Sequence, residues 1–255
     1  MGLRGLLYRL YQRRLSAALP PDQIPRHVAV MVDGNRRWAR SRLQPGHVSR
    51  GHQAGADKIH EFLGWCDEIG VDVVTIYLLS TGNLARSADE LEPLLAIIED
   101  LVDELAACGR WRVHPVGALD MLPPTTVRVL KDAETRTTDV AGMTVNCAVG
   151  YGGREELADA VRSLLHEHAS RGTSLDELAD RIDVDDIARH LYTRGQPDPD
   201  LVIRTSGEQR LSGFLLWQSA NSEFYFCEAF WPDFRKVDFL RALRSYAARH
   251  RRFGR

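Results

Sequence analysis

Two guanidinium groups and a carboxylate follow directly after an apolar run, at residues that tolerate a tight turn. The apolar run is HVAVMV (27–32), and the polar residues after it are Asp33, Gly34, Asn35, Arg36 and Arg37. Glycine and asparagine adopt unusual backbone dihedrals at low cost, and a helix that starts at such a turn aims free amides at one point. Together with the arginines, these amides would form a cradle for an anion.

Asp33 does not fit a simple anion site. Two like charges about 4 Å apart repel by roughly 4 kcal/mol at an effective dielectric near 20. A divalent cation between the carboxylate and a diphosphate would turn that repulsion into attraction, and oxygen ligands favour magnesium. The alternative is that Asp33 caps a helix and that both arginines are solvated.

A second polar loop follows the apolar run DLVIR (200–204). It reads RTSGEQRLSGFLLWQ, in which Arg204, Arg210 and Ser212 can converge with loop amides on another phosphate group. Glu223, in SANSEFYF, is a further candidate oxygen ligand for a metal. Two such loops at strand ends favour two phosphorylated ligands sharing one metal.

A third polar loop runs from Ser80 to Arg86 after the apolar run 71–80, and it would face the same crevice. The alternative is an ordinary turn followed by a capped helix. Ser87 and Glu90 have the spacing of a capping box, which predicts a helix start there.

Apolar runs alternate with helical patterns along the chain. This alternation predicts a single-domain α/β fold, with a mainly parallel central sheet flanked by helices. The polar stretch 171–200 is predicted to be a helical insertion. The apolar face of the helix from 88 either packs in the core or lines an apolar tunnel, because periodicity alone cannot separate the two. Strands are expected at 27–32, 71–80, 111–117, 143–150, 200–204 and 214–218, and helices near 52–69, from 88, near 124–137 and near 154–170.

Composition narrows the class of protein. The 255 residues are 44% hydrophobic with a formal charge of −2, which allows a large core and argues against a general nucleic-acid binder. The first 50 residues contain ten arginines and two acidic residues, an excess that suits small anionic ligands or an anionic membrane surface. The four cysteines are scattered, as expected for reduced thiols in a cytoplasmic protein.

Residues 1–24 are predicted to form an amphipathic helical extension before a domain spanning 25–255. The helix would either dock on the body of the protein or touch a membrane surface. Neither a membrane-spanning run nor a signal peptide is visible in the sequence. The apolar face of the extension consists of Leu3, Leu6, Leu7, Leu10 and Tyr11.

The motifs HVAVMVDGNRRWAR, GHQAGA, SGEQRLSGFLLWQ and SEFYF resemble, in combination, those of the cis-prenyltransferases, the undecaprenyl diphosphate synthase family. The resemblance covers about residues 25–254, and the short-chain actinobacterial members that make (2Z,6E)-farnesyl diphosphate look most similar. It implies a Mg²⁺-dependent homodimer that condenses isopentenyl diphosphate with an allylic diphosphate such as geranyl diphosphate, forming a Z double bond. A P-loop or nucleophile motif is not recognisable.

The resemblance also implies roles for individual residues. Asp33 would bind Mg²⁺ with Glu223, and Asn83 would relay the proton with Ser80. Arg252 would reach a diphosphate across the dimer. The allylic substrate would contact Gly34, Asn35, Arg36, Arg37, Trp38 and His52; Thr81, Gly82 and Arg86 would complete the substrate loop; and isopentenyl diphosphate would contact Arg204, Arg210, Leu211 and Ser212.

Departures from the long-chain pattern bear on substrate and product. Arg36 stands where long-chain members usually have glycine, and Val48 where they carry an arginine, so Arg36 is expected to compensate. Gly82 and Leu84 replace a Glu and a Trp in the substrate loop, and Gln209 replaces a common histidine. Leu78 occupies a place where long-chain members have a small residue, and packed interiors leave little slack, so a C15 product is expected.

Three alternatives remain from the sequence. The chain could make longer polyprenyl diphosphates, or it could be a branching or cyclising prenyl synthase, as the altered loop around Gly82 suggests. It could also be a non-catalytic subunit that serves a partner.

Overall fold

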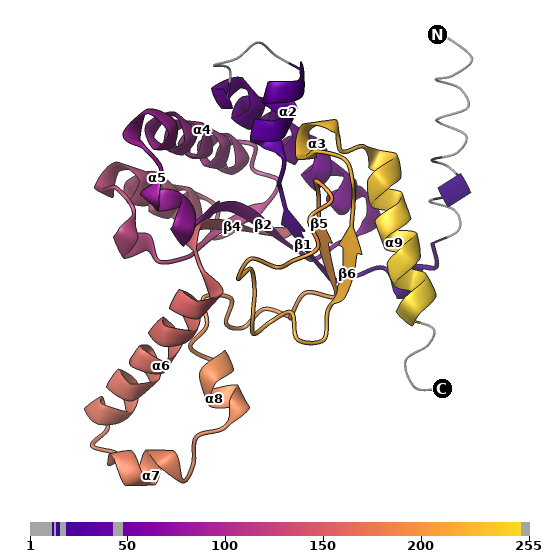
Figure 1. Ribbon diagram of the computed structural model, residues 1–255. Coiled ribbons are helices and arrows are strands. Elements are labelled where there is room, and N and C mark those ends of the chain that lie inside the picture. Colours follow the sequence, from indigo (N-terminus) through magenta and orange to yellow (C-terminus); the bar gives the residue numbers. More distant parts are fainter. Residues whose placement is uncertain (1–11, 13, 16–18, 43–47, 251–255) are drawn as a thin grey trace, which may run out of the picture.

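The computed structural model describes residues 12, 14, 15, 19–42 and 48–250 (Figure 1). These residues form one six-stranded sheet in the order β3-β4-β2-β1-β5-β6, and every neighbouring pair is parallel. The predicted single-domain α/β fold is therefore confirmed. The strands are β1 (His27–Met31), β2 (Val73–Ser80), β3 (Arg112–Val116), β4 (Thr144–Tyr151), β5 (Leu201–Arg204) and β6 (Glu223–Phe226).

Helices follow the strands at most crossovers, as the alternating pattern predicted. They are α2 (Asn35–Arg42), α3 (Val48–Ile69), α4 (Ala88–Ala107), α5 (Pro124–Arg136), α6 (Gly153–Ser170), α7 (Leu175–Ala179), α8 (Val184–Ala188) and α9 (Lys236–His250). Short 3-10 turns are η1 (Pro21–Gln23), η2 (Thr81–Ala85), η3 (Leu119–Met121) and η4 (Trp231–Asp233).

The two faces of the sheet are covered differently. Side chains alternate between the faces of a strand. In β1, Val28 and Val30 join the large core formed with α3, α4, α5 and α9. Ala29 and Met31 instead join a small cluster that includes Phe214. The second face is thus covered largely by loop residues.

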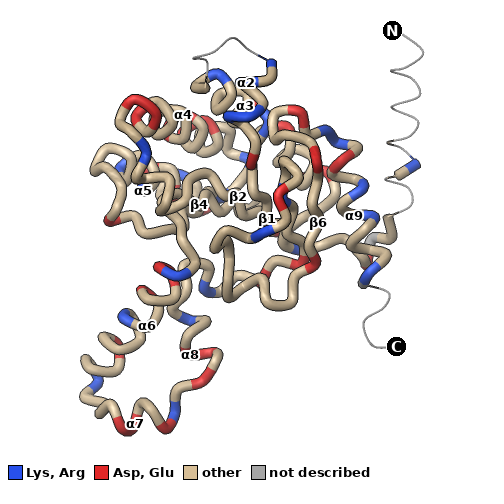
Figure 2. The backbone as a smooth tube through the Cα atoms, viewed as in Figure 1, with Lys and Arg blue, Asp and Glu red and all other residues tan. Residues whose placement is uncertain are grey.

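The predicted insertion contains the helices α7 and α8, and it projects from the body together with α6 (Figure 1). Val161 and Leu165 are exposed on α6, as are Leu175 and Val184 further along. Figure 2 shows charged residues of both signs spread along this projection and over the body.

Two local predictions were wrong. Residues 214–218 form consecutive turns instead of a strand, because Phe214 and Leu215 are buried as part of a loop. The strand next to β5, at the edge of the sheet, is β6, which begins at Glu223, eight residues after Leu215. Ser87 lies at the start of α4, but its side chain makes no capping hydrogen bond. The carboxylate of Glu90 turns instead to two arginines of the site.

The N-terminal extension reaches the body at its end. Leu15 is buried in the large core, and Leu19 packs against it. The predicted apolar face at Leu3, Leu6, Leu7, Leu10 and Tyr11 lies outside the described residues. No helix among the described residues has the length and apolarity needed to cross a bilayer.

Candidate active site

Three polar loops meet at the carboxyl edge of the sheet because their strands are neighbours in register. Met31 at the end of β1 is paired with Tyr77 of β2 on one side and with Arg204 of β5 on the other. The turn after β1, the turn after β2 and the loop after β5 therefore surround one crevice, as expected for an open parallel sheet.

Asp33 lies at the centre of this crevice. Its Oδ2 atom accepts a hydrogen bond from Nη2 of Arg204 at 2.9 Å, and its Oδ1 atom lies 3.5 Å from Nη2 of Arg37. Burial, the largest single influence, raises the pKa of Asp33, but the hydrogen bonds from Arg204 and Ser206 and the charges of Arg204 and Arg37 outweigh it. The net effect is a pKa below the usual 3.8, so the carboxylate stays ionised.

The turn after Asp33 depends on close backbone packing. Gly34 has a φ of +105°, and a Cβ atom there would lie 2.8 Å from the ring of Phe230. A Cβ atom at Gly51 would lie 2.3 Å from the carbonyl oxygen of Asn35, and one at Gly55 would lie 2.6 Å from its side chain. The glycines of α3 therefore let this helix press against the start of α2.

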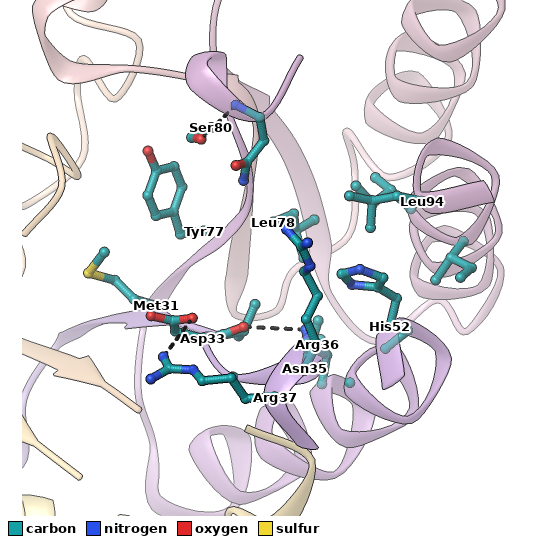
Figure 3. Close-up of a pocket in the computed structure, with 18 of the residues that line it drawn as sticks. Met31, Asp33, Asn35, Arg36, Arg37, His52, Tyr77, Leu78, Ser80 and Leu94 are labelled. Atoms are coloured by element: carbon teal, nitrogen blue, oxygen red, sulfur yellow. Dashed lines mark hydrogen bonds and ion pairs between the residues drawn. The ribbon is translucent and has the colours of Figure 1, made fainter. Parts of the chain in front are cut away.

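The two arginines of the turn point in different directions (Figure 3). Arg37 donates to Oγ of Ser206 at 2.6 Å and to Glu208 at 3.2 Å, which ties the turn to the loop after β5. Arg36 extends the other way, between His52 and Leu78. Its guanidinium lies 3.3 Å from the carboxylate of Glu90.

Glu90 holds a second guanidinium as well. Arg86 lies 2.9 Å from the same carboxylate oxygen, four residues away on the chain. Beside these charges the pKa of His52 is lowered to about 4, chiefly by burial and further by Arg86 and Arg36, so its imidazole is neutral near pH 7. Sequence reasoning assigned Glu90 to a helix cap, although its i,i+4 spacing from Arg86 was a signal for an ion pair.

The loop after β5 is strained. Its Arg204 is 4% exposed and donates to Oγ of Ser212 at 3.1 Å and to the carbonyl oxygen of Arg210. Ser206, Ser212 and Leu215 have φ values of 75°, 48° and 46°, and they are the three non-glycine residues with positive φ in the described part of the chain. Each such residue costs about 1–2 kcal/mol, and strain of this kind tends to gather at functional loops.

The crevice opens into a cavity of about 520 Å³ that changes from polar to apolar along its length. The polar end holds Asp33, the arginines and Asn83, whose backbone N–H donates to Oγ of Ser80 at 3.2 Å. The apolar end lies between β2, α3 and α4, where four side chains from Leu94 to Leu101 cover about 10 Å of helix axis. The apolar lining comprises Ala56, Ile59, Leu78, Leu94, Ile97, Ile98 and Leu101.

Most predicted site residues line this cavity: Asp33, Gly34, Asn35, Arg36, Arg37, His52, Leu78, Ser80, Asn83, Arg86, Arg204 and Ser212. Trp38, Thr81, Gly82, Arg210 and Leu211 lie in the same segments but outside the lining. The side chain of Arg210 is 64% exposed and pairs with Glu208. Arg252 lies outside the described residues. Tyr77 and Arg40 also line the cavity but were missed. Tyr77 lies within an apolar run, and Arg40 ends the first motif but was given no role.

Glu223 is not brought to Asp33 within one chain. It starts β6 and pairs with Leu201, which pairs with Val28 near the amino end of β1. Asp33 lies five residues after Val28 along the chain, which corresponds to about 16 Å of extended backbone. The Glu223 carboxylate instead accepts a hydrogen bond from Arg249 at 2.8 Å.

Comparisons with known proteins agree on the class. The family model for undecaprenyl diphosphate synthase matches residues 31–254. A (2Z,6E)-farnesyl diphosphate synthase of Thermobifida fusca is 67% identical over 99% of this chain and 98% of that protein. Isoprenyl transferase 1 of Streptomyces avermitilis is 62% identical over 99% of this chain and 97% of its own length.

A (2Z,6E)-farnesyl diphosphate synthase of Mycobacterium tuberculosis is 55% identical over 99% of this chain and 97% of that protein. Among solved structures, lavandulyl diphosphate synthase from Lavandula x intermedia in complex with dimethylallyl diphosphate superposes with a TM-score of 0.81. The two sequences are 36% identical, and the match covers 89% of this chain and 96% of that one.

Proposed function

Because this chain belongs to the undecaprenyl diphosphate synthase family of prenyltransferases, we propose that it is a Z-type chain-elongating enzyme. It condenses isopentenyl diphosphate with an allylic diphosphate, geranyl diphosphate by preference, and gives (2Z,6E)-farnesyl diphosphate and free diphosphate. Close relatives that carry this name and share 55–67% of the sequence support the short product.

The observation that carries the proposal is the polarity of the cavity. Guanidinium groups and an ionised carboxylate surround one end, while aliphatic side chains of α3, α4 and β2 surround the other. A diphosphate with an apolar tail matches both ends at once, because guanidinium forks pair with phosphate and apolar walls bind the tail. Such walls also keep water from a reacting carbocation-like centre.

The two diphosphates are assigned to the two arginine loops. The allylic group lies at the turn after β1, against the start of α2, with Arg36 and Arg37 beside it and with the neutral His52 nearby. Isopentenyl diphosphate lies at the loop after β5, where Arg204 and Ser212 face the cavity. The allylic carbon–oxygen bond breaks, the double bond of the isopentenyl group attacks that carbon, and a proton leaves.

Asp33 is the residue suited to hold Mg²⁺. The described residues contain no cluster of three metal-binding side chains, so the remaining ligands would be phosphate oxygens and water, as is common for magnesium. When bound, the ion stabilises negative charge on the leaving diphosphate. Asn83, held by Ser80, lies at the cavity and is the residue assigned to help remove the proton.

Incubation with Mg²⁺, labelled isopentenyl diphosphate and either dimethylallyl, geranyl or farnesyl diphosphate tests the proposal. A C15 product with a new Z double bond, formed best from geranyl diphosphate and lost on chelation, is expected. The absence of any condensation product would defeat it.

A second candidate function is branching or cyclisation on the same fold. The solved structure of lavandulyl diphosphate synthase with dimethylallyl diphosphate keeps this candidate open. Chromatography of the product against linear and branched standards separates the two.

A homodimer is part of the proposal. β6 is an edge strand in which Phe226 is 38% exposed, and the projecting α6 exposes Val161 and Leu165. Open edges and apolar patches of this kind usually meet a partner. A second copy is also the route by which Glu223 could approach a metal at Asp33. Analytical ultracentrifugation is expected to give twice the mass of one chain, whereas a monomer would contradict this part.

We also propose that the enzyme works in the cytoplasm, since its four cysteines are free thiols. Peripheral contact of the N-terminal extension with the cell membrane stays a prediction. Vesicle flotation of the full chain against a variant that lacks residues 1–11 tests it.

A further inference from the structure

Glu156 is a buried carboxyl group that none of the substrate contacts uses. It lies in the first turn of α6 and is 1% exposed. Its Oε1 atom accepts hydrogen bonds from the backbone amide of Tyr192 at 2.9 Å and from Nε2 of Gln218 at 3.0 Å. Its Oε2 atom accepts the hydroxyl hydrogen of Tyr151. Among the described residues its hydrogen-bond donors are all uncharged, although buried carboxylates are usually paired with a cation.

The partners of Glu156 belong to the structure that supports the loop after β5. Gln218 lies within the consecutive turns that follow Leu211 and also donates to Thr193 at 3.0 Å. Tyr151 meets Phe214 edge to face at 6.0 Å between ring centroids. Phe214 in turn stacks on Tyr77, a residue of the cavity wall, at 4.6 Å.

The start of α6 and the loop are in close contact. The amide of Gly153 donates to the carbonyl oxygen of Gly213 at 2.9 Å. A Cβ atom at Gly153 would lie 2.4 Å from that oxygen and 2.8 Å from the side chain of Leu216. The helix that carries Glu156 therefore presses directly on the residues that follow Ser212.

This support matters because the loop does not hold its own shape. Ser206, Ser212 and Leu215 have positive φ values that side chains other than glycine disfavour. Such conformations persist only where the surroundings over-determine them. α6 and Tyr151 contact Gly213, Phe214 and Gln218, which lie between or shortly after the strained residues Ser212 and Leu215.

We propose that Glu156 is a positioning residue that locks the 206–218 loop and thereby aligns Arg204 and Ser212 for the diphosphate of the isopentenyl substrate. The inference rests on the proposed function. The turn after β1, assigned to the allylic substrate, has no contact with Glu156 or its partners Tyr151, Tyr192 and Gln218 among the hydrogen bonds of the described residues. Arg37 of that turn contacts the loop at Ser206 and Glu208, whereas α6 and Tyr151 contact it at 213–218. The loss of Glu156 should therefore affect the site of isopentenyl diphosphate more strongly than the allylic site.

Steady-state kinetics of Glu156→Ala and of Gln218→Leu test the assignment. Both changes are expected to raise KM for isopentenyl diphosphate by about tenfold or more, since buried donors lose their acceptor in Glu156→Ala and buried acceptors lose a donor in Gln218→Leu. KM for the allylic diphosphate is expected to stay within about twofold. Glu156→Gln keeps the shape of the side chain and an oxygen acceptor for Tyr192 and Gln218, so it should restore most of the wild-type KM.

Leu164→Ala is the matched control. Leu164 is 1% exposed and lies eight residues after Glu156 on the same helix, so its truncation should destabilise α6 while the hydrogen bonds of Glu156 remain. Equal rises of both KM values, or a rise in the control as large as in Glu156→Ala, would overturn the proposal. So would unchanged kinetics in a folded Glu156→Ala variant.

Trypsin cleavage after Arg210 gives a readout that does not depend on activity. Arg210 is exposed but sits in the locked loop. Its cleavage is expected to be about tenfold faster in Glu156→Ala than in the wild type or Leu164→Ala, relative to cleavage elsewhere. If cleavage is faster in Glu156→Ala but the wild type catalyses no condensation, the proposed function is wrong and the role of Glu156 in holding the loop remains. If the cleavage rate of Glu156→Ala equals that of the wild type, the role of Glu156 in holding the loop is wrong.

Discussion

The two ends of the parallel sheet treat polar side chains in opposite ways. At the carboxyl end, the charged side chains of Asp33 and Arg204 line an open cavity. At the amino end, His27 and Thr75 are buried in a closed network, with His27 Nε2 2.8 Å from Thr75 Oγ1. Asn146 completes that network by donating to Thr75 at 2.9 Å.

The difference shows what each end is built for. Neutral groups that satisfy one another stabilise the fold, because a buried polar group without a partner is costly. Charged groups held in a strained loop contribute less to the free energy of folding than neutral groups that satisfy one another, but they are already positioned to bind an anion. Substitutions at the carboxyl end should therefore change kinetics, and those at the amino end should change stability.

Asp33→Asn is expected to give the largest effect. The amide keeps the shape and an acceptor for Arg204 but loses the charge that binds Mg²⁺. We expect kcat/KM to fall by about 10³-fold or more, equivalent to about 4 kcal/mol. The free energy of unfolding should fall by only about 1–2 kcal/mol. Urea unfolding and kinetics on the same preparation compare the two, and retained activity would contradict the role of Asp33.

The amino end should respond to acid. Burial, the main cause, lowers the pKa of His27 to about 4, against 6.5 in the unfolded chain. Between these values the unfolded state binds more protons, so stability falls as pH falls from 6.5 to 4 and is unaffected above 6.5. The loss amounts to about 3 kcal/mol.

Urea unfolding of the wild type and of His27→Gln at pH 7 and pH 4.5 isolates this contribution. The wild type should lose about 2–3 kcal/mol more than the variant over that interval. Equal losses would mean that His27 is not held neutral by the fold.

Thr75→Val should remove the hydroxyl group at the centre of the amino-end network. His27 and Asn146 each lose one partner, so we expect the free energy of unfolding to fall by about 1–3 kcal/mol. Both KM values should stay unchanged. Thr135→Val, at an exposed hydroxyl on α5, is the control and should be nearly neutral. A kinetic defect in Thr75→Val would break the distinction between the two ends.

Leu78→Ala should have a small effect on rate and a qualitative effect on product. Leu78 lines the apolar end of the cavity beside α4, and its truncation opens space for a longer tail. We expect products beyond C15 from geranyl diphosphate, read by chromatography of the dephosphorylated alcohols. An unchanged C15 product would show that another residue limits the chain length.

Most of the fold and the polar part of the site could be predicted from the sequence. The strands at 27–32 and 71–80 and the helix from 88 were predicted because periodicity and flanking polar residues agreed. The strand predicted at 214–218 is wrong, since an apolar run that is buried as turns has the same composition as a strand. Glu90 was misread for a similar reason, because spacing that suits a cap also suits an ion pair with Arg86.

The sequence by itself determined the chemistry at Asp33, Arg36, Arg37 and Arg204, because residue types set charge and hydrogen-bonding capacity. Only the tertiary structure decided which of these groups meet. The pairing of β1 with β5 brings Arg204 to Asp33, and the same register leaves Glu223 at the opposite edge. The hold that Glu156 has on the loop also depends on contacts across the chain, and distances between residues far apart in sequence are not encoded in any local pattern.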